Sequence, residues 1–158
     1  MLKPLLQGLA LMAAASAVQA APIDLIIDTD PGADDLVALF LAMASPDELK
    51  IRAITTVAGN VRLEKTARNA RLAREWAGRE DIPVYAGAGR PLVRAPIYAA
   101  EVHGEEGVTG VEVHEPKQPL ASGNAVQYLV DTLGTAPPHS VTLAMLGPQT
   151  NLALALSL

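Results

Sequence analysis

The stretch that decides the fold of this chain is an apolar run, Ile23-Asp24-Leu25-Ile26-Ile27, followed directly by an acidic octet, Asp28-Thr29-Asp30-Pro31-Gly32-Ala33-Asp34-Asp35. Four carboxylates fall within these eight residues, and no Lys or Arg accompanies them. Two unit charges about 4 Å apart repel by roughly 1 kcal/mol in water and by several-fold more in a partly dry site. The octet therefore needs a compensating cation, and oxygen-only ligands favour Ca²⁺ or Mg²⁺ over zinc or copper.

Around the octet, strand-like and helix-like segments alternate, which is typical of a parallel sheet covered by helices. We expect strands at residues 23–28, 49–57, 82–85 and 140–146, helices at 34–44, 62–76 and 122–133, the last capped by Ser122, and a further helix beginning within 147–151. Residues 87–120 lack periodicity and are rich in Gly, Pro and charge, so we expect a long functional loop there. The predicted fold class is α/β, with a Rossmann-like, mostly parallel sheet and flanking helices.

The first twenty residues have the layout of a secretory signal, with Lys3, an apolar section over residues 5–15, and small residues up to Ala20. We expect residues 1–20 to be removed and residues 21–158 to act in a periplasm or outside the cell. The apolar section is too short to span a bilayer, so we expect no membrane attachment after its removal. Cysteine is absent, so no disulfide stabilises the domain despite the oxidising compartment.

The charge of the chain is acidic, at −5 overall and −6 once the single Lys of the leader is removed. An acidic chain is a poor candidate for binding nucleic acid or anionic lipid. The segment 62–76 is nevertheless rich in Lys and Arg outside its apolar stripe, and we interpret these residues as the solvated face of an amphipathic helix. Two i,i+4 ion pairs are expected on it, namely Glu64/Arg68 and Arg71/Glu75.

Three motifs follow predicted strands: the octet at 28–35, Ala58-Gly59-Asn60, and residues 147–151. Ligands bind beyond the carboxyl ends of the strands in open α/β sheets. A tight turn at Pro31-Gly32 lets the carboxylates on its two sides face one point. Asp34 alone would be interpreted as a helix N-terminal charge or cap, but the four carboxylates together indicate a metal site.

Two other classes of protein also place several acidic residues in one short stretch. An EF-hand is excluded because the twelfth position from Asp28 is Leu39, where a bidentate Glu is needed. An Asp-x-Asp phosphatase is an alternative, since Asp28-Thr29-Asp30 follows a strand as a phosphatase nucleophile would. Pro31-Gly32 and the second Asp pair fit that class badly.

The chain resembles the inosine-uridine preferring nucleoside hydrolases, whose opening signature Asp-Thr-Asp-Pro-Gly-x-Asp-Asp stands unbroken at residues 28–35. The resemblance continues through Thr55-Thr56-Val57-Ala58-Gly59-Asn60, Asn69-Ala70, His103-Gly104-Glu105-Glu106-Gly107 and Leu146-Gly147-Pro148-Gln149-Thr150-Asn151. It spans essentially all of residues 21–158 but only about the first half of the family's domain. We therefore expect residues 21–158 to form the N-terminal part of a nucleoside hydrolase domain.

The resemblance implies a Ca²⁺ ion held by Asp30, Asp35 and the backbone carbonyl of Thr150, with Asp28 supporting these ligands. It also implies that Asp30 takes a proton from a metal-bound water, which attacks the anomeric carbon of the sugar. An ordinary N-cap role remains the alternative for Thr150, and it would leave the carbonyl available.

The resemblance further implies that Asp34 and Asn60 hold the ribose hydroxyls. His103 is expected to line the pocket, with a mobile glycine-flanked loop as the alternative, and Asn60 has a plain turn residue as its alternative. His114 and His139 have neither metal spacing nor a motif, so we expect both at the surface.

The sequence thus predicts a calcium-dependent hydrolase that cleaves the N-glycosidic bond of small ribonucleosides to ribose and free base. An alternative is a non-catalytic remnant that binds ribose or calcium. Its basis is that no residue here matches the family's second-half Asp and His, and that the apolar end 151–158 lacks a C-cap and should be covered by absent structure. The sequence determines neither the preferred nucleobase nor the oligomeric state. A homo-oligomer is one of the alternatives that stay open.

Overall fold

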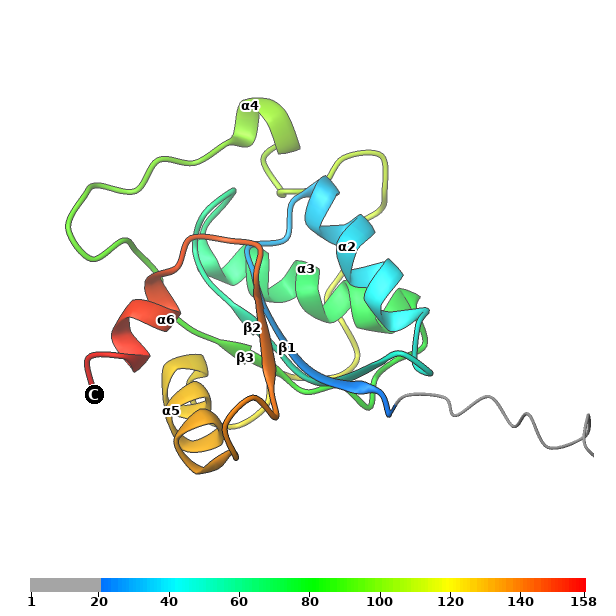
Figure 1. The fold of residues 1–158 in the computed structure, drawn as a ribbon. Helices are drawn as coiled ribbons and strands as arrows, with labels where there is room; N and C mark the ends of the chain where they lie inside the picture. The colour runs from blue at the N-terminus through cyan, green and yellow to red at the C-terminus, as the bar shows by residue number, and fades with distance from the viewer. Residues whose placement is uncertain (1–20) are drawn as a thin grey trace, which may run out of the picture.

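The computed structural model describes residues 21–158 (Figure 1), and the expected leader at 1–20 lies outside this range. Its elements are β1 (Ile23–Thr29), α2 (Ala33–Met43), β2 (Leu49–Thr56), α3 (Leu63–Trp76), β3 (Val84–Ala86), α4 (Ala100–His103), α5 (Ala125–Thr135), β4 (Thr142–Met145) and α6 (Thr150–Ala155). All strand pairs are parallel, and the sheet order is β3-β2-β1-β4. The expected α/β class with a parallel sheet is confirmed.

The strand β1 lies inside the sheet and is paired on both sides. Ile27 is opposite Ile54 of β2 and Ala144 of β4, and Asp28 is opposite Thr55 and Met145. A strand covered on both faces favours a continuous apolar run over alternation, which explains the run that precedes the octet. Because the pairs are parallel, the carboxyl ends of β1, β2 and β4 open at one edge of the sheet.

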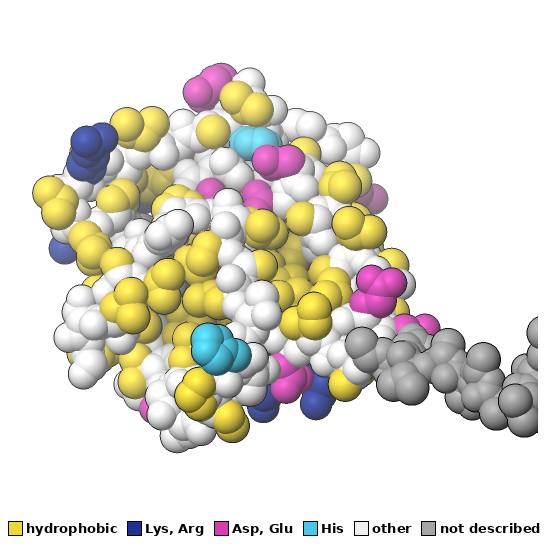
Figure 2. Space-filling view, in the orientation of Figure 1, with side chains coloured by type: hydrophobic (Ala, Val, Ile, Leu, Met, Phe, Trp, Pro, Cys, Tyr) yellow, Lys and Arg dark blue, Asp and Glu magenta, His cyan; other side chains and the backbone are white. Residues whose placement is uncertain are grey.

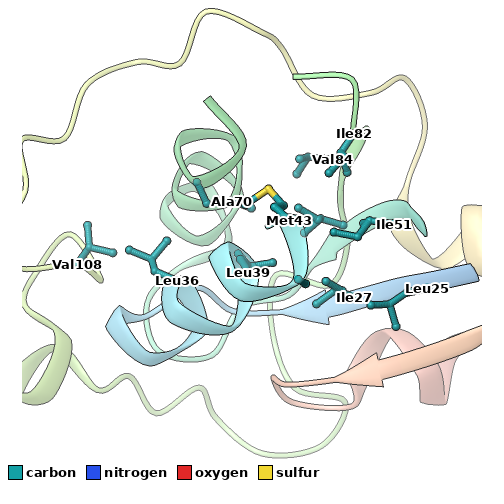
Figure 3. Packing of buried hydrophobic residues seen from close by; sticks show 13 residues of the cluster. Leu25, Ile27, Leu36, Leu39, Met43, Ile51, Ala70, Ile82, Val84 and Val108 are labelled. Atoms are coloured by element: carbon teal, nitrogen blue, oxygen red, sulfur yellow. The ribbon is translucent and has the colours of Figure 1, made fainter. Parts of the chain in front are cut away.

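Helices cover both faces of the sheet, with α2 and α3 on one side and α5 and α6 on the other (Figure 1). The core under α2 and α3 is a cluster to which α2 contributes Leu39 and Met43, α3 contributes Ala70, and β1 contributes Ile27 (Figure 3). Fully burying one such Leu or Ile side chain stabilises a fold by about 1.5–3 kcal/mol. This packing fixes the start of α2, and with it the octet, against the sheet.

Hydrophobic side chains gather on the face of the molecule where β4 forms the edge of the sheet (Figure 2). Over the described residues as a whole, the exposed large hydrophobic side chains include Val37 and Leu41 of α2 and Leu146, which follows β4. Within residues 21–158, no helix combines the length and apolar character that a membrane crossing requires.

The structure corrects two sequence expectations about local elements. The cap of α5 is Asn124, whose side chain accepts a hydrogen bond from Val126 N at 2.8 Å, and not Ser122. The expected loop at 87–120 contains one short helix, α4, which ends at His103. A single helical turn leaves too little periodicity to be recognised in sequence.

The polar face of α3 is largely covered, contrary to the expected solvated face, although Arg62 and Glu64 at its start are exposed. Neither expected i,i+4 pair forms, because Arg68 binds Glu106 at 2.7 Å and Arg71 binds Glu115 at 2.8 Å. Both acidic partners belong to the long loop, which lies along the helix. Arg74 is 3% exposed and donates only to backbone carbonyls.

Candidate active site at the carboxyl edge of the sheet

Asp28 lies at the end of β1 and is fully buried. One oxygen, Oδ2, accepts hydrogen bonds from Thr55 Oγ1 at 2.6 Å and from Asn151 Nδ2 at 2.7 Å. The other oxygen, Oδ1, is buried and has no partner among the described residues. Burial raises the pKa of Asp28, and the two donors oppose this shift. One oxygen is therefore fixed while the other can still bind a proton or a cation.

Asp30 sits between two glycines from the ends of β2 and β4. Its Oδ2 accepts a hydrogen bond from Asn60 N at 2.7 Å. A Cβ atom on Gly59 would lie 2.0 Å from Asp30 Oδ2, and one on Gly147 would lie 2.5 Å from Oδ1. Real Cβ atoms do not approach this closely, so both loops reach the carboxylate only because neither residue has a side chain.

The pKa of Asp30 is raised to about 6, chiefly because burial disfavours the charged form. The hydrogen bond from Asn60 N lowers it, and the negative charges of Asp35 and Asp34 raise it further. A carboxylate with a pKa near 6 is a stronger base than an ordinary Asp and remains mostly ionised at neutral pH. Asp30 is therefore suited to accept a proton in a reaction.

Asp35, in the first turn of α2, is held by neighbours from three segments. Thr29 Oγ1 donates to its Oδ1 at 2.7 Å, and Gly32 N donates to its Oδ2 at 3.2 Å. Asn60 Nδ2 also donates to Oδ2 at 3.3 Å, and to the carbonyl of Asp30 at 3.0 Å. Asn60 thus links Asp30 and Asp35 through its backbone and its side chain.

His103 lies against the turn of the octet. Its Nδ1 accepts a hydrogen bond from Ala33 N at 3.4 Å and lies 3.9 Å from Asp34 Oδ1. A Cβ atom on Gly32 would lie 2.7 Å from Asn60 Nδ2 and 2.8 Å from His103 Nδ1, so the three residues meet at this glycine. Acidic side chains gather beside a histidine below α4 (Figure 2).

Residues 25–158 match the family model described as inosine-uridine preferring nucleoside hydrolase. The chain belongs to the nucleoside hydrolase family. Family membership favours this interpretation over the Asp-x-Asp phosphatase alternative. It also agrees with the parallel sheet and with the acidic octet at the end of β1.

Individual relatives support the same assignment of this nucleoside hydrolase chain. It is 48% identical over 135 residues to the pyrimidine-specific ribonucleoside hydrolase RihA of Salmonella enteritidis, covering 85% of this chain and 43% of that protein. It is 49% identical over 133 residues to an uncharacterised protein of Schizosaccharomyces pombe, covering 84% and 43%. The solved plant nucleoside hydrolase PpNRh1 superposes with a TM-score of 0.79 at 39% identity, covering 86% and 43%. The chain thus spans less than half the length of these relatives.

The remaining expected site residues lie in different surroundings. The Asp34 side chain is 78% exposed, and its Oδ1 lies 3.9 Å from His103 Nδ1. Thr150 is the buried first residue of α6, but its neighbour Asn151 makes the contact with Asp28. The proposed roles of Asp34 and Thr150 remain predictions.

The histidines expected at the surface lie there. His114 Nε2 is 2.9 Å from Glu75 Oε1 and its side chain is 45% exposed. His139 is exposed, with a positive φ of 63°.

Two residues important for the geometry were not singled out from the sequence. Thr55 and Asn151 both donate to Asp28. Asn151 also donates to the carbonyl of Thr56 at 3.0 Å and accepts from Ala88 N at 2.8 Å. It therefore joins α6 to the ends of β1, β2 and β3. The motif at 147–151 was the available signal, but Asn at a helix start is usually a cap.

The donor set fits a hard cation in its chemistry. Asp28, Asp30 and Asp35 are buried, and none of them forms an ion pair with a Lys or Arg of the described chain. The unpartnered Asp28 Oδ1 is an oxygen available to such an ion. No three acidic or histidine side chains of residues 21–158 are close enough together to form a ready-made metal site.

Proposed function

We propose that this chain forms the cation-binding and water-activating part of a nucleoside hydrolase that uses Ca²⁺ and cleaves ribonucleosides. The observation that carries the proposal is Asp30, a buried carboxylate whose pKa is raised to about 6 by burial and by the charges of Asp35 and Asp34, and which forms no ion pair with a Lys or Arg of the described residues. A divalent cation relieves the repulsion between neighbouring carboxylates of this kind.

In this proposal Asp28, Asp30 and Asp35 hold the ion together with the backbone carbonyl of Thr150. Bound calcium would supply positive charge that lowers the pKa of a neighbouring water molecule and would orient the ribose diol. Asp30 accepts a proton from this water molecule while the oxygen of the water forms a bond to the anomeric carbon. The glycosidic bond breaks at the same centre, and its electron pair leaves with the base.

The substrate side of the site is proposed to include Asn60, His103 and Asp34. The side chains of Asn60 and His103 both lie beside Gly32, in the turn of the acidic octet. Asp34 lies at the surface of the same turn and would hold a ribose hydroxyl after rotating its side chain inward. The relatives carry names with different base preferences, including pyrimidine-specific and purine-preferring hydrolases. We therefore propose a ribonucleoside as substrate and assign no base.

The proposal is tested with the 158-residue chain by calorimetric titration with Ca²⁺ and by measuring reducing sugar released from inosine and uridine. We expect calcium binding that is lost on Asp30→Asn and kept in the control Asp131→Asn, because Asp131 lies on the exposed face of α5. Sugar release abolished by EDTA would support catalysis. Calcium binding without sugar release would favour the ribose- or calcium-binding remnant, and absence of both would refute the proposal.

The location of the protein is also a proposal. We propose that it acts in a periplasm or outside the cell, on the basis of the leader pattern at residues 1–20. Fractionation of expressing cells with an N-terminal sequence of the product tests this. A product that begins at Met1 and stays in the cytoplasm would contradict it.

A further inference from the structure

We propose that Asn69 of α3 is a positioning residue of this site, which ties the turn of the acidic octet to the loop that carries His103. The bridge itself follows from the contacts described below, whereas its consequence for catalysis rests on the proposed function. None of the atoms of Asn69 is expected to touch substrate.

The side chain of Asn69 bonds to both segments at once. It is 1% exposed, and its Nδ2 donates to the carbonyl of Pro31 at 3.2 Å and to the carbonyl of Glu106 at 2.9 Å. Pro31 belongs to the octet, and Glu106 follows His103 by three residues. Both amide hydrogens are therefore used, one on each segment.

The backbone of the loop is shaped to reach this amide. Gly104 and Gly107 have φ values of 80° and 77°, and Gly107 N donates to the carbonyl of Gly104 at 2.9 Å. A Cβ atom on Gly107 would lie 2.9 Å from Asn69 Nδ2 and 2.8 Å from Val61 Cγ2. Two left-handed glycines thus let the loop approach α3 closely enough for the Glu106 carbonyl to bond.

Two basic side chains of α3 also bind the loop at Glu106. Lys65 Nζ lies 3.0 Å from Glu106 Oε1, and Arg68 Nη1 lies 2.7 Å from Glu106 Oε2. These pairs are partly exposed and are weakened by solvent and salt. Arg68 Nη2 also donates to the Glu106 carbonyl, at 3.3 Å. The amide of Asn69 is buried and unscreened, and it bonds to the octet as well as to the loop.

The chemistry of this position requires an amide. A carboxylate would face two carbonyl oxygens without a hydrogen to donate. An apolar side chain would leave the Pro31 carbonyl without its donor and the Glu106 carbonyl with Arg68 Nη2 alone, at 3.3 Å. Loss of the bridge releases the loop from the octet. His103 then loses its fixed place beside Gly32, although it contacts no part of Asn69.

The experiment compares wild type, Asn69→Leu and Gly107→Ala in the 158-residue chain. Gly107→Ala displaces the loop from an intact Asn69 and tests the bridge without changing the interior of α3. Amide hydrogen exchange is measured over residues 99–110 and over β1, together with the NMR resonances of the His103 ring. Asn124→Ala, in the exposed cap of α5, is the control.

We expect both bridge variants to exchange at least about tenfold faster over residues 99–110 with little change in β1, and the His103 resonances to move toward those of a free histidine. A uniform rise in exchange would indicate a merely structural role and would overturn the inference. Unchanged loop exchange and His103 resonances in Gly107→Ala would overturn it as well, even if Asn69→Leu failed to fold. Because neither readout needs turnover, failure of the proposed hydrolase activity leaves this test intact.

Discussion

Replacing Asn151 with Ala should strongly destabilise the fold, although this residue lies close to the end of the chain. Its side chain makes two buried hydrogen bonds, to the carboxylate of Asp28 and the carbonyl of Thr56, and a partly buried one to the amide of Ala88. A bond to a charged group contributes about 1.5–3 kcal/mol and each neutral bond about 1 kcal/mol. The free energy of unfolding should therefore fall by about 3–5 kcal/mol.

This prediction is measured by urea unfolding at pH 7.5 with EDTA present. The control is Asn124→Ala, which removes a single exposed cap bond to Val126 N and should cost about 1 kcal/mol. Since typical domains are stable by only about 5–15 kcal/mol, the difference between the variants is large enough to resolve. Equal losses of stability would refute the argument that Asn151 joins the three strand ends.

Three further predictions concern the acidic group and the long loop. In metal-free protein the contribution of Asp30 to the free energy of unfolding should fall by about 2 kcal/mol between pH 4 and pH 6, because its pKa is about 6 when folded and 3.8 ordinarily, so the folded state binds the extra proton in this range. Urea unfolding of wild type and Asp30→Asn measures this, and equal slopes would contradict it. Gly59→Ala should weaken Ca²⁺ binding at least about tenfold, since its Cβ would displace the Asp30 carboxylate; unchanged calorimetric affinity would argue against Asp30 as a ligand. Arg74→Met should lower the free energy of unfolding by about 2–4 kcal/mol and speed amide exchange in residues 115–121, because it leaves the carbonyls of Ile82 and Pro119 unpaired. Unaltered exchange in these residues would show that Arg74 does not hold the loop against α3.

The octet could be interpreted from sequence because its geometry is local. An apolar run, a Pro-Gly turn and a following helix determine where β1 ends and α2 begins, and the structure has both boundaries within one residue of the prediction. The site residues on other segments were harder to predict. Asn151 reaches Asp28 across 123 residues, and a parallel sheet order is needed before such a contact can be deduced.

Asp34 shows why four neighbouring carboxylates do not all enter one site. Asp34 and Asp35 are consecutive residues of α2, and consecutive helical side chains do not face the same direction. Asp35 turns inward to Thr29, so Asp34 faces solvent. Once the start of the helix is known, the sequence indicates that Asp34 and Asp35 face different directions. The density of charge alone suggests that all four carboxylates converge.

The polar face of α3 was misinterpreted for a related reason. Amphipathic periodicity identifies the face that packs on the sheet and says nothing about what covers the opposite face. Here an aperiodic loop lies along that face and is bound largely through its backbone carbonyls. Carbonyl acceptors are present in every sequence, so no pattern of side chains in the loop reveals the contact.

The way in which the structure restrains its carboxylates is itself an argument for a cation. Asp28 is held by Thr55 and Asn151, and Asp30 by the backbone of Asn60, all of which are neutral donors. A Lys or Arg at this edge would cancel the charge and compete with a metal ion for the same oxygens. Neutral donors fix the oxygens in place while leaving most of the negative charge uncompensated. The free-energy cost of burying these charged carboxylates is then greatest when no divalent ion is bound. Binding of such an ion should therefore stabilise the folded chain.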